Sequence, residues 1–136
     1  MFYNPGTPDR GATLMTHPHA IVHFEISSKD RAAMKKFYGD VFAWEFKDYD
    51  EMNYTTFTAE GGSPGGFNPI TDTNSAGTIT PYINTPDIAD SIKKIKAAGG
   101  DVLMEPMEIP TVGHYSMFKD PSGNLMALLQ PLPMEG

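Results

Sequence analysis

The chain contains no cysteine, which excludes every form of cysteine chemistry across its 136 residues. It can hold no disulfide, no thiolate nucleophile and no metal or cluster site built on sulfur ligands. Positive charge is also scarce, with 10 Lys and Arg against 17 Asp and Glu and a formal net charge of -7. Because nucleic-acid binding needs clustered Lys and Arg, we expect no nucleic-acid partner.

Long apolar runs are missing as well. No stretch approaches the roughly 20 apolar residues that cross a bilayer, so we expect no membrane partner. Residues 1–19 are rich in Pro, Gly and Thr and lack the apolar segment of a secretory signal. We interpret 1–19 as an N-terminal arm, either mobile or laid over a partner subunit, and we expect a cytoplasmic protein. The length predicts a core that needs no crosslinks.

The residues that are present form two similar halves. HAIVHFEIS at 19–27 alternates like a strand, and SSKDRAAMKKFYGDVF has helical spacing with a serine cap and Gly39 near the end. WEFKDY and NYTTFTA read as strands, whereas GGSPGGFNPI interrupts the pattern and TDTNSAG is a linker.

The second half repeats this order. TITPYINT is a strand, Thr85-Pro86-Asp87 begins a helix, and Gly99-Gly100 ends it. DVLMEPMEI, GHYSMFKD and NLMALLQ are further strands, the last of them apolar on both faces after the tight turn DPSG. Overlaying 21–26 on 80–85 matches His23 with Tyr82 and Glu25 with Asn84, if the first half carries a short extra stretch before its helix. An internal repeat of about sixty residues predicts a pseudo-twofold fold with a cavity between two sheets.

These segments resemble a known superfamily. IVHFEISSKDRAAMKKFYGDVFAWEF resembles the opening of a vicinal oxygen chelate module, and AAGGDVLMEP with MFKDPSGNLMALLQ resembles its closing part. The resemblance covers residues 20–131. The superfamily includes glyoxalase I, extradiol dioxygenases and the bleomycin resistance proteins, and the sequence is most similar to its small glyoxalase-like subgroup. It implies an α+β fold of two βαβββ modules whose curved mixed sheets face each other. We therefore expect one domain over 20–133, with module one at 20–73 and module two at 78–133, and a homodimer.

Metal-dependent members of that superfamily bring ligands from four positions. By the resemblance these fall near Ile21, near Thr80, around Gly66 and Phe67, and on Ala127, and none of them offers a ligand. We therefore expect no cofactor and a loss of the usual metal site. A divalent metal at a rebuilt site, with His23 and either Glu25 or His114, stays an alternative because imidazole and carboxylate suit such ions.

The polar residues of the two first strands form the candidate site. His23 and Glu25 share one strand face, and Tyr82 and Asn84 occupy the matching face in the second half. Together they could orient a carbonyl or phenol, with His23 and Glu25 as the catalytic pair and Tyr82 and Asn84 as substrate contacts. The alternative is that His23 and Glu25 form a buried pair that only fixes the strand register.

Three further residues are candidates for substrate binding. Phe67 follows the glycines of GGSPGGFNPI and is predicted to be a movable wall beside the cavity. His114 and Tyr115 lie on opposite faces of one strand, so one of them should face the cavity, and the sequence does not decide which.

Two functions remain after these steps. The first is an enzyme that acts on a small oxygenated organic substrate by proton-transfer or lyase chemistry. The alternative is a non-catalytic protein that binds and sequesters a small molecule, as the bleomycin resistance proteins do.

Overall fold

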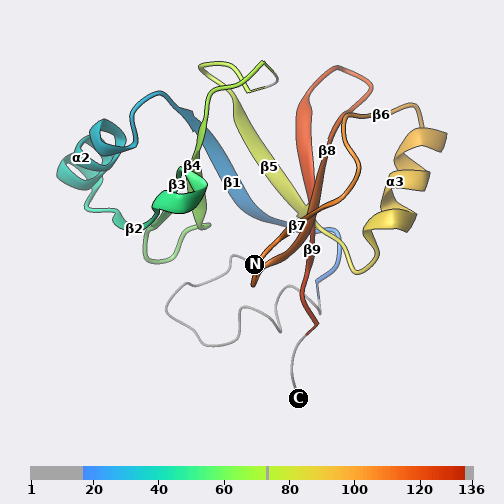
Figure 1. The fold of residues 1–136 in the computed structure, drawn as a ribbon, viewed down its shortest axis with the longest axis horizontal. Helices are drawn as coiled ribbons and strands as arrows, with labels where there is room; N and C mark the ends of the chain where they lie inside the picture. Colours follow the sequence, from blue (N-terminus) through green and yellow to red (C-terminus); the bar gives the residue numbers. More distant parts are fainter. Residues whose placement is uncertain (1–16, 73, 134–136) are drawn as a thin grey trace. The chain divides into compact units, whose positions relative to one another are not determined.

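The computed structural model describes residues 17–72 and 74–133, which fall into two compact units. The first unit comprises 23–80, and the second comprises 17–22 together with 81–133. Residues 1–16 of the predicted arm lie outside the described residues. In Figure 1 residues 23–80 of the first unit run from blue to yellow-green, and the second unit comprises the blue residues 17–22 and residues 81–133, which run from yellow-green to red.

The first unit is a four-stranded sheet with one helix. Its elements are β1 (Ile21–Ser28), α2 (Arg31–Phe42), β2 (Glu45–Tyr49), the short 3-10 helix η1 (Asp50–Met52), β3 (Tyr54–Thr58) and β4 (Gly65–Pro69). The strand order is β2-β3-β4-β1, with β1 parallel to β4 and the other pairs antiparallel. The glycine-rich stretch, which the sequence analysis treated as irregular, therefore supplies a central strand.

The second unit repeats the plan. Its elements are β5 (Ile79–Asn84), α3 (Ile88–Ala97), β6 (Asp101–Val102), β7 (Met107–Ile109), β8 (Gly113–Lys119) and β9 (Leu125–Pro131). The order is β5-β9-β8-β6, β7 pairs with β8, and β5 is parallel to β9. The single strand expected at 101–109 is thus two short ones. The α+β fold of two βαβββ modules is confirmed.

Both helices begin at an aspartate. The Asp30 carboxylate accepts a hydrogen bond from the Ala33 amide at 3.1 Å, and Asp87 accepts one from the Asp90 amide at 3.0 Å. The expected serine cap of α2 is therefore wrong, because Asp30 is the N-cap and its side chain satisfies the free amide of Ala33. Gly39 lies inside α2, which ends instead at Ala43 in a left-handed conformation.

The N-caps align the two modules. His23 lies as far before Asp30 as Thr80 lies before Asp87, and Glu25 then matches Tyr82. The sheet registers agree, because Glu25 pairs with Gly66 where Tyr82 pairs with Ala127. The equivalence drawn from the sequence was therefore offset by two residues, and no extra stretch precedes the first helix.

The first unit has an aromatic core on the face of its sheet that α2 covers. The Trp44 ring stacks between those of Tyr38 and Phe57, with centroid distances of 4.6 Å in each case. Phe67, with no exposed surface, lies 5.2 Å from Phe57 and 5.9 Å from Tyr38. Tyr38 belongs to the helix, so these rings attach α2 to the sheet.

The second unit has apolar packing on both faces of β9. Leu128 packs with Ile88 and Phe118 on the side of α3, and Ala127 and Leu129 pack with Tyr82 on the other. Ala127, Leu128 and Leu129 are 0%, 3% and 5% exposed, which confirms the prediction of a strand buried on both sides.

Residues 17–20 are bound to β5 of the second unit. The His19 amide donates to the Asn84 carbonyl at 2.6 Å, and the Asn84 amide donates to the Ala20 carbonyl at 2.9 Å. The Asn84 side-chain amide also donates to the His17 carbonyl at 3.1 Å. One buried asparagine therefore fixes the segment that precedes β1.

Candidate functional site

The polar side chains of the first unit gather on the sheet face opposite α2. His23 and Glu25 lie on this face of β1, because residues 24 and 26 pair with Gly65 and Phe67 of β4 and therefore lie on the face that α2 covers. Tyr54 and Thr56 of β3 lie on the same face, since Thr56 is paired with Gly66 and Gly66 with Glu25. The predicted sharing of a face by His23 and Glu25 holds in the structure.

A hydrogen bond joins β1 to β3 across this face. His23 Nε2 and the Tyr54 hydroxyl are 2.7 Å apart, and their rings lie nearly parallel at an interplanar angle of 28°. Strand β4 lies between the two strands that carry these residues. The bond therefore spans a strand, which an ordinary side chain at the intervening position would prevent.

Gly66 makes that crossing sterically allowed. A Cβ atom added to Gly66 would overlap the hydroxyl and ring carbons of Tyr54. Gly65 has the corresponding role on the opposite face, where the Phe57 ring occupies the space of its missing side chain. The two consecutive glycines thus admit one ring on each face of β4.

The Glu25 carboxylate is oriented by Asn68. The Asn68 side-chain amide donates to Glu25 Oε1 at 3.1 Å, from the strand that is parallel to β1. His23 and Glu25 are both half-buried, so this face combines a fixed carboxylate with a fixed imidazole and phenol. These groups can accept a proton, donate one and polarise a carbonyl oxygen.

The second unit presents a different face at the equivalent strand. Tyr82 is 6% exposed and packs with Ala127 and Leu129, and Tyr115 is half-buried against the same cluster. Asn84, which is 1% exposed, holds the segment at 17–20. The predicted contact of Tyr82 and Asn84 with substrate stays a prediction.

His114 and Tyr115 lie on opposite faces of β8, and which of them faces a cavity stays a prediction. Tyr115 shares the face of Tyr82, because it pairs with Leu129 of the same cluster. His114 lies on the other face of β8, where its register partners are Gln130 and Glu108. Tyr115 therefore lies on the same sheet face as Tyr82, and His114 does not.

Phe67 does not lie where the sequence analysis expected it. As the neighbour of Gly66 on β4 it points to the opposite face from Glu25, into the aromatic core under α2. Its complete burial leaves it no freedom to act as a movable wall.

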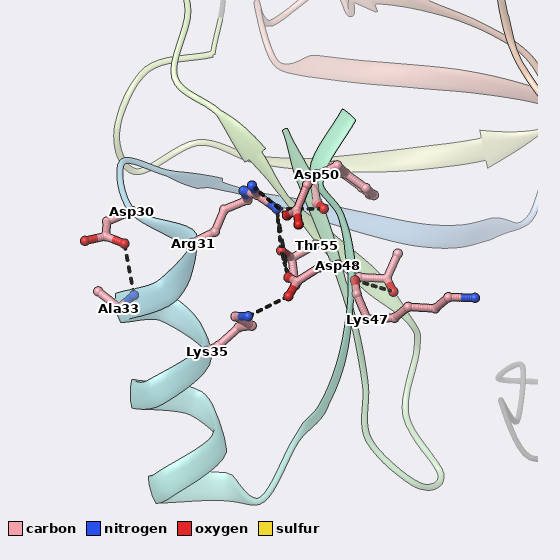
Figure 2. Close-up of polar contacts among 10 residues, drawn as sticks. Asp30, Arg31, Ala33, Lys35, Lys47, Asp48, Asp50 and Thr55 are labelled. Atoms are coloured by element: carbon pink, nitrogen blue, oxygen red, sulfur yellow. Dashed lines mark hydrogen bonds and ion pairs between the residues drawn. The ribbon is translucent and has the colours of Figure 1, made fainter. Parts of the chain in front are cut away.

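An ion-pair network ties the start of α2 to β2 and β3. Arg31 donates to the Tyr54 carbonyl at 2.9 Å and to Thr55 Oγ1 at 3.0 Å, and Lys35 Nζ lies 2.7 Å from Asp48 (Figure 2). The Lys35 ammonium, followed by the Thr55 hydroxyl, lowers the pKa of Asp48 below its ordinary value. Because Arg31 fixes the backbone at Tyr54, this network also positions the phenol that reaches His23.

The donors of this face do not fit the metal site of the superfamily. With the modules aligned by their N-caps, the first of the four ligand positions falls on His23 rather than Ile21, and the others fall on Thr80, Gly66 and Ala127. Only His23 is a strong ligand, whereas a stable site needs three or four. Among residues 17–72 and 74–133, no cluster of three or more His, Cys, Asp or Glu could hold a metal ion.

Sequence reasoning missed Tyr54 and Asn68, the two partners of the predicted pair. The alternation in NYTTFT places Tyr54 on one strand face, and the signal that could have found it is the adjacent Gly65-Gly66.

No helix in the part of the chain that the structure describes is both long and apolar enough to span a membrane.

Comparison with known proteins places this fold in a family. The profile of the Glyoxalase/Bleomycin resistance protein/Dioxygenase superfamily matches residues 20–128. Anthracycline biosynthesis protein DauV from Streptomyces sp. (strain C5) is 32% identical, over 88% of this chain and 50% of its own length. The chain thus spans about half the length of that relative.

Two solved structures share the fold. A glyoxalase/bleomycin resistance protein/dioxygenase superfamily member from Vibrio splendidus 12B01 gives a TM-score of 0.60 at 16% identity, over 82% of this chain and 98% of its own. Methylmalonyl-CoA epimerase from Mycobacterium tuberculosis gives 0.58 at 15% identity, over 83% and 88%. The chain belongs to the glyoxalase/bleomycin resistance protein/dioxygenase superfamily.

Proposed function

We propose that the protein is an enzyme that moves a proton on a small oxygenated organic molecule bound against the polar face of the first unit. The observation that supports this is the 2.7 Å contact between His23 Nε2 and the Tyr54 hydroxyl, on the face that carries Glu25. A purely structural strand face has no need of an imidazole, a phenol and a carboxylate side by side.

The three groups divide the chemistry between them. Glu25, oriented by Asn68, removes a proton from a carbon next to a carbonyl group. The electron pair of that C–H bond forms a C=C bond, and the π pair of the carbonyl group moves to its oxygen, which the Tyr54 hydroxyl stabilises by donating a hydrogen bond. His23 positions the phenol, and return of the proton to the same or another carbon completes an isomerisation or epimerisation.

The substrate class is suggested by the Streptomyces relative. Its name assigns that protein to anthracycline biosynthesis, although this chain covers only half of its length. We therefore propose a fused-ring aromatic polyketide with ketone and phenol groups. Such molecules contain acidic C–H bonds beside carbonyls, which is the chemistry that the first unit can perform.

The alternative is sequestration of a similar molecule without chemistry. The observation that favours it lies in the second unit, whose equivalent face has the rings of Tyr82 and Tyr115 beside Leu129 and no carboxylate or imidazole in that cluster. Tyrosine rings bind flat aromatic molecules by stacking and need no proton transfer for it.

Hydrogen–deuterium exchange separates the two functions. The protein is incubated with an anthracyclinone ketone in deuterated buffer, and solvent deuterium entering the carbon next to the carbonyl is followed by NMR. We expect Glu25→Gln to slow exchange by about 100-fold or more, with Tyr54→Phe and His23→Ala also impaired. Tyr115→Phe, in the second unit, is the matched control and should exchange at the wild-type rate.

The opposite result is equally informative. Exchange that Glu25→Gln leaves unchanged would refute the proposed base. Tight stoichiometric binding of an unexchanged ketone, measured by calorimetry, would instead favour sequestration. Repeating the assay after chelator treatment tests whether a metal is needed, and sedimentation velocity tests the expected homodimer. A cytoplasmic location stays a prediction.

A further inference from the structure

A pocket lies in the first unit, where β1 ends and α2 begins. It has a volume of about 240 Å³. Its walls come from the end of β1, the first residues around α2, the turn before β3 and the end of β4, and the lining residues are Ser28, Lys29, Arg31, Asn53, Pro69 and Ile70. None of them belongs to the set of His23, Glu25 and Tyr54.

Two cations line the pocket in different states. Lys29 is exposed and has no ion pair among the interactions of the described residues. The Arg31 side chain is 23% exposed, and its guanidinium is held by the Tyr54 carbonyl and the Thr55 hydroxyl. One cation is thus fixed in place and the other is able to move toward a ligand.

Ser28 adds a buried hydroxyl to the pocket wall. The residue is 6% exposed, and its Oγ has no hydrogen-bond partner among the described residues. A buried hydroxyl without a partner is unfavourable, and one that lines a pocket can donate to a ligand oxygen after rotation about its single side-chain bond. This orphaned group is the observation that points to a ligand.

The N-terminus of α2 also favours an anion in this pocket. The N-terminus of α2 carries a partial positive charge, and no acidic residue stands in its first turn, whereas α3 has Asp90 there. The Asp30 carboxylate is occupied by the Ala33 amide. Two carboxylates form ion pairs with Arg31 in the described part of the unit, Asp50 with its Oδ1 at 3.3 Å and Asp48 with its Oδ1 at 3.9 Å (Figure 2).

We propose that this pocket binds a small oxyanion, either phosphate or the carboxylate of a metabolite, between Lys29 and Arg31 with the Ser28 hydroxyl and the Asn53 amide as further donors. The pocket volume accommodates such a group, and all four side chains can donate hydrogen bonds. The inference does not rest on the proposed enzymatic function, because it uses none of the same side chains.

Calorimetric titration with inorganic phosphate, and separately with succinate, tests the site in the full chain at constant ionic strength. We expect Lys29→Ala to weaken binding by about five- to tenfold and Ser28→Ala to weaken it less. Lys93→Ala removes another exposed lysine, from α3 in the second unit, and should leave the affinity unchanged. The anion that binds more tightly identifies the source of the oxyanion.

Asp50→Asn supplies a test in the opposite direction. Its carboxylate competes for the Arg31 guanidinium, so its neutralisation should tighten anion binding. A wild-type protein that shows no saturable binding of either anion would overturn the proposal. Equal weakening by Lys29→Ala and Lys93→Ala would also overturn it, because the effect would then come from net charge alone.

Discussion

The two units have the same βαβββ plan, but the equivalent faces of their sheets differ in chemistry. At the strand pair where the first unit has Glu25 opposite Gly66, the second has Tyr82 opposite Ala127. The first face bears an imidazole, a phenol and a carboxylate, whereas the second is packed with apolar side chains and tyrosine rings. Helix caps and strand pairing therefore set the backbone, and single residues on one face set the chemistry.

The largest expected effects come from the two cores. Phe67→Ala should lower the free energy of unfolding by about 3–5 kcal/mol, and Leu128→Ala by about 2–5 kcal/mol, because each leaves a cavity at a buried site. Trp44 fluorescence follows the first unit, and far-ultraviolet circular dichroism follows both. If Leu128→Ala, in the second unit, also shifts the Trp44 transition of the first, the two units unfold together.

The next largest effect should come from the glycine that separates the two faces. Gly66→Ala should cost about 1–3 kcal/mol, because the new methyl group displaces the Tyr54 ring and breaks its bond to His23. Ala127→Gly, at the matching position, is the control. We expect it to cost about 0.5–1 kcal/mol through backbone entropy, and to leave ketone binding intact. Urea titration measures both, and equal losses of binding would contradict the role given to Gly66.

A smaller and equal effect is expected at the helix starts. Asp30→Ala and Asp87→Ala should each cost about 1 kcal/mol, since the caps have the same extended conformation and hydrogen-bond pattern. Thermal denaturation of both variants measures the difference. A much larger loss in one variant would show that the two caps contribute unequally to stability although their backbone conformations are the same.

The smallest effect concerns acid. The Lys35 ammonium lowers the pKa of Asp48 in the first unit, and the Asn124 side chain lowers the pKa of Asp120 in the second. A carboxyl whose folded-state pKa is depressed stabilises the protein above its ordinary value of 3.8, and this contribution is lost as the pH falls below that value toward the folded-state pKa. Asp48→Asn and Asp120→Asn should therefore lose less stability than wild type between about pH 5 and pH 2. If the stability of both variants falls with pH just as that of wild type does, neither carboxylate contributes to the acid sensitivity of the protein.

Local signals predicted most of the fold. The alternation of HAIVHFEIS correctly predicted a strand. The glycines after the second helix marked its end, and the DPSG turn marked the start of the last strand. These patterns are reliable because they act within a few residues. Boundaries were less accurate where two caps competed, as with the serines and Asp30. The glycine-rich strand was missed because glycine has a low strand propensity. In this sheet the missing side chains leave the space that the Tyr54 and Phe57 rings occupy.

The candidate site was harder to predict than the fold. That His23 and Glu25 share a face follows from alternation, but Tyr54 reaches His23 only because β4 lies between their strands and is bare at Gly66. The order of strands in a sheet depends on contacts between residues far apart in sequence. The same limit explains why Phe67 was predicted to be a movable wall although it is buried, since the face on which it lies depends on which glycine pairs with Glu25.

The bonds between residues 17–20 and Asn84 have a consequence for how the chain can be divided. Among the described residues, the second unit takes 17–22 from before residues 23–80 of the first and 81–133 from after them. During synthesis on the ribosome the segment at 17–22 must wait until β5 has emerged. A cut in the linker at 71–77 would produce two fragments, neither of which carries the complete second unit, so that this unit would need both fragments to form.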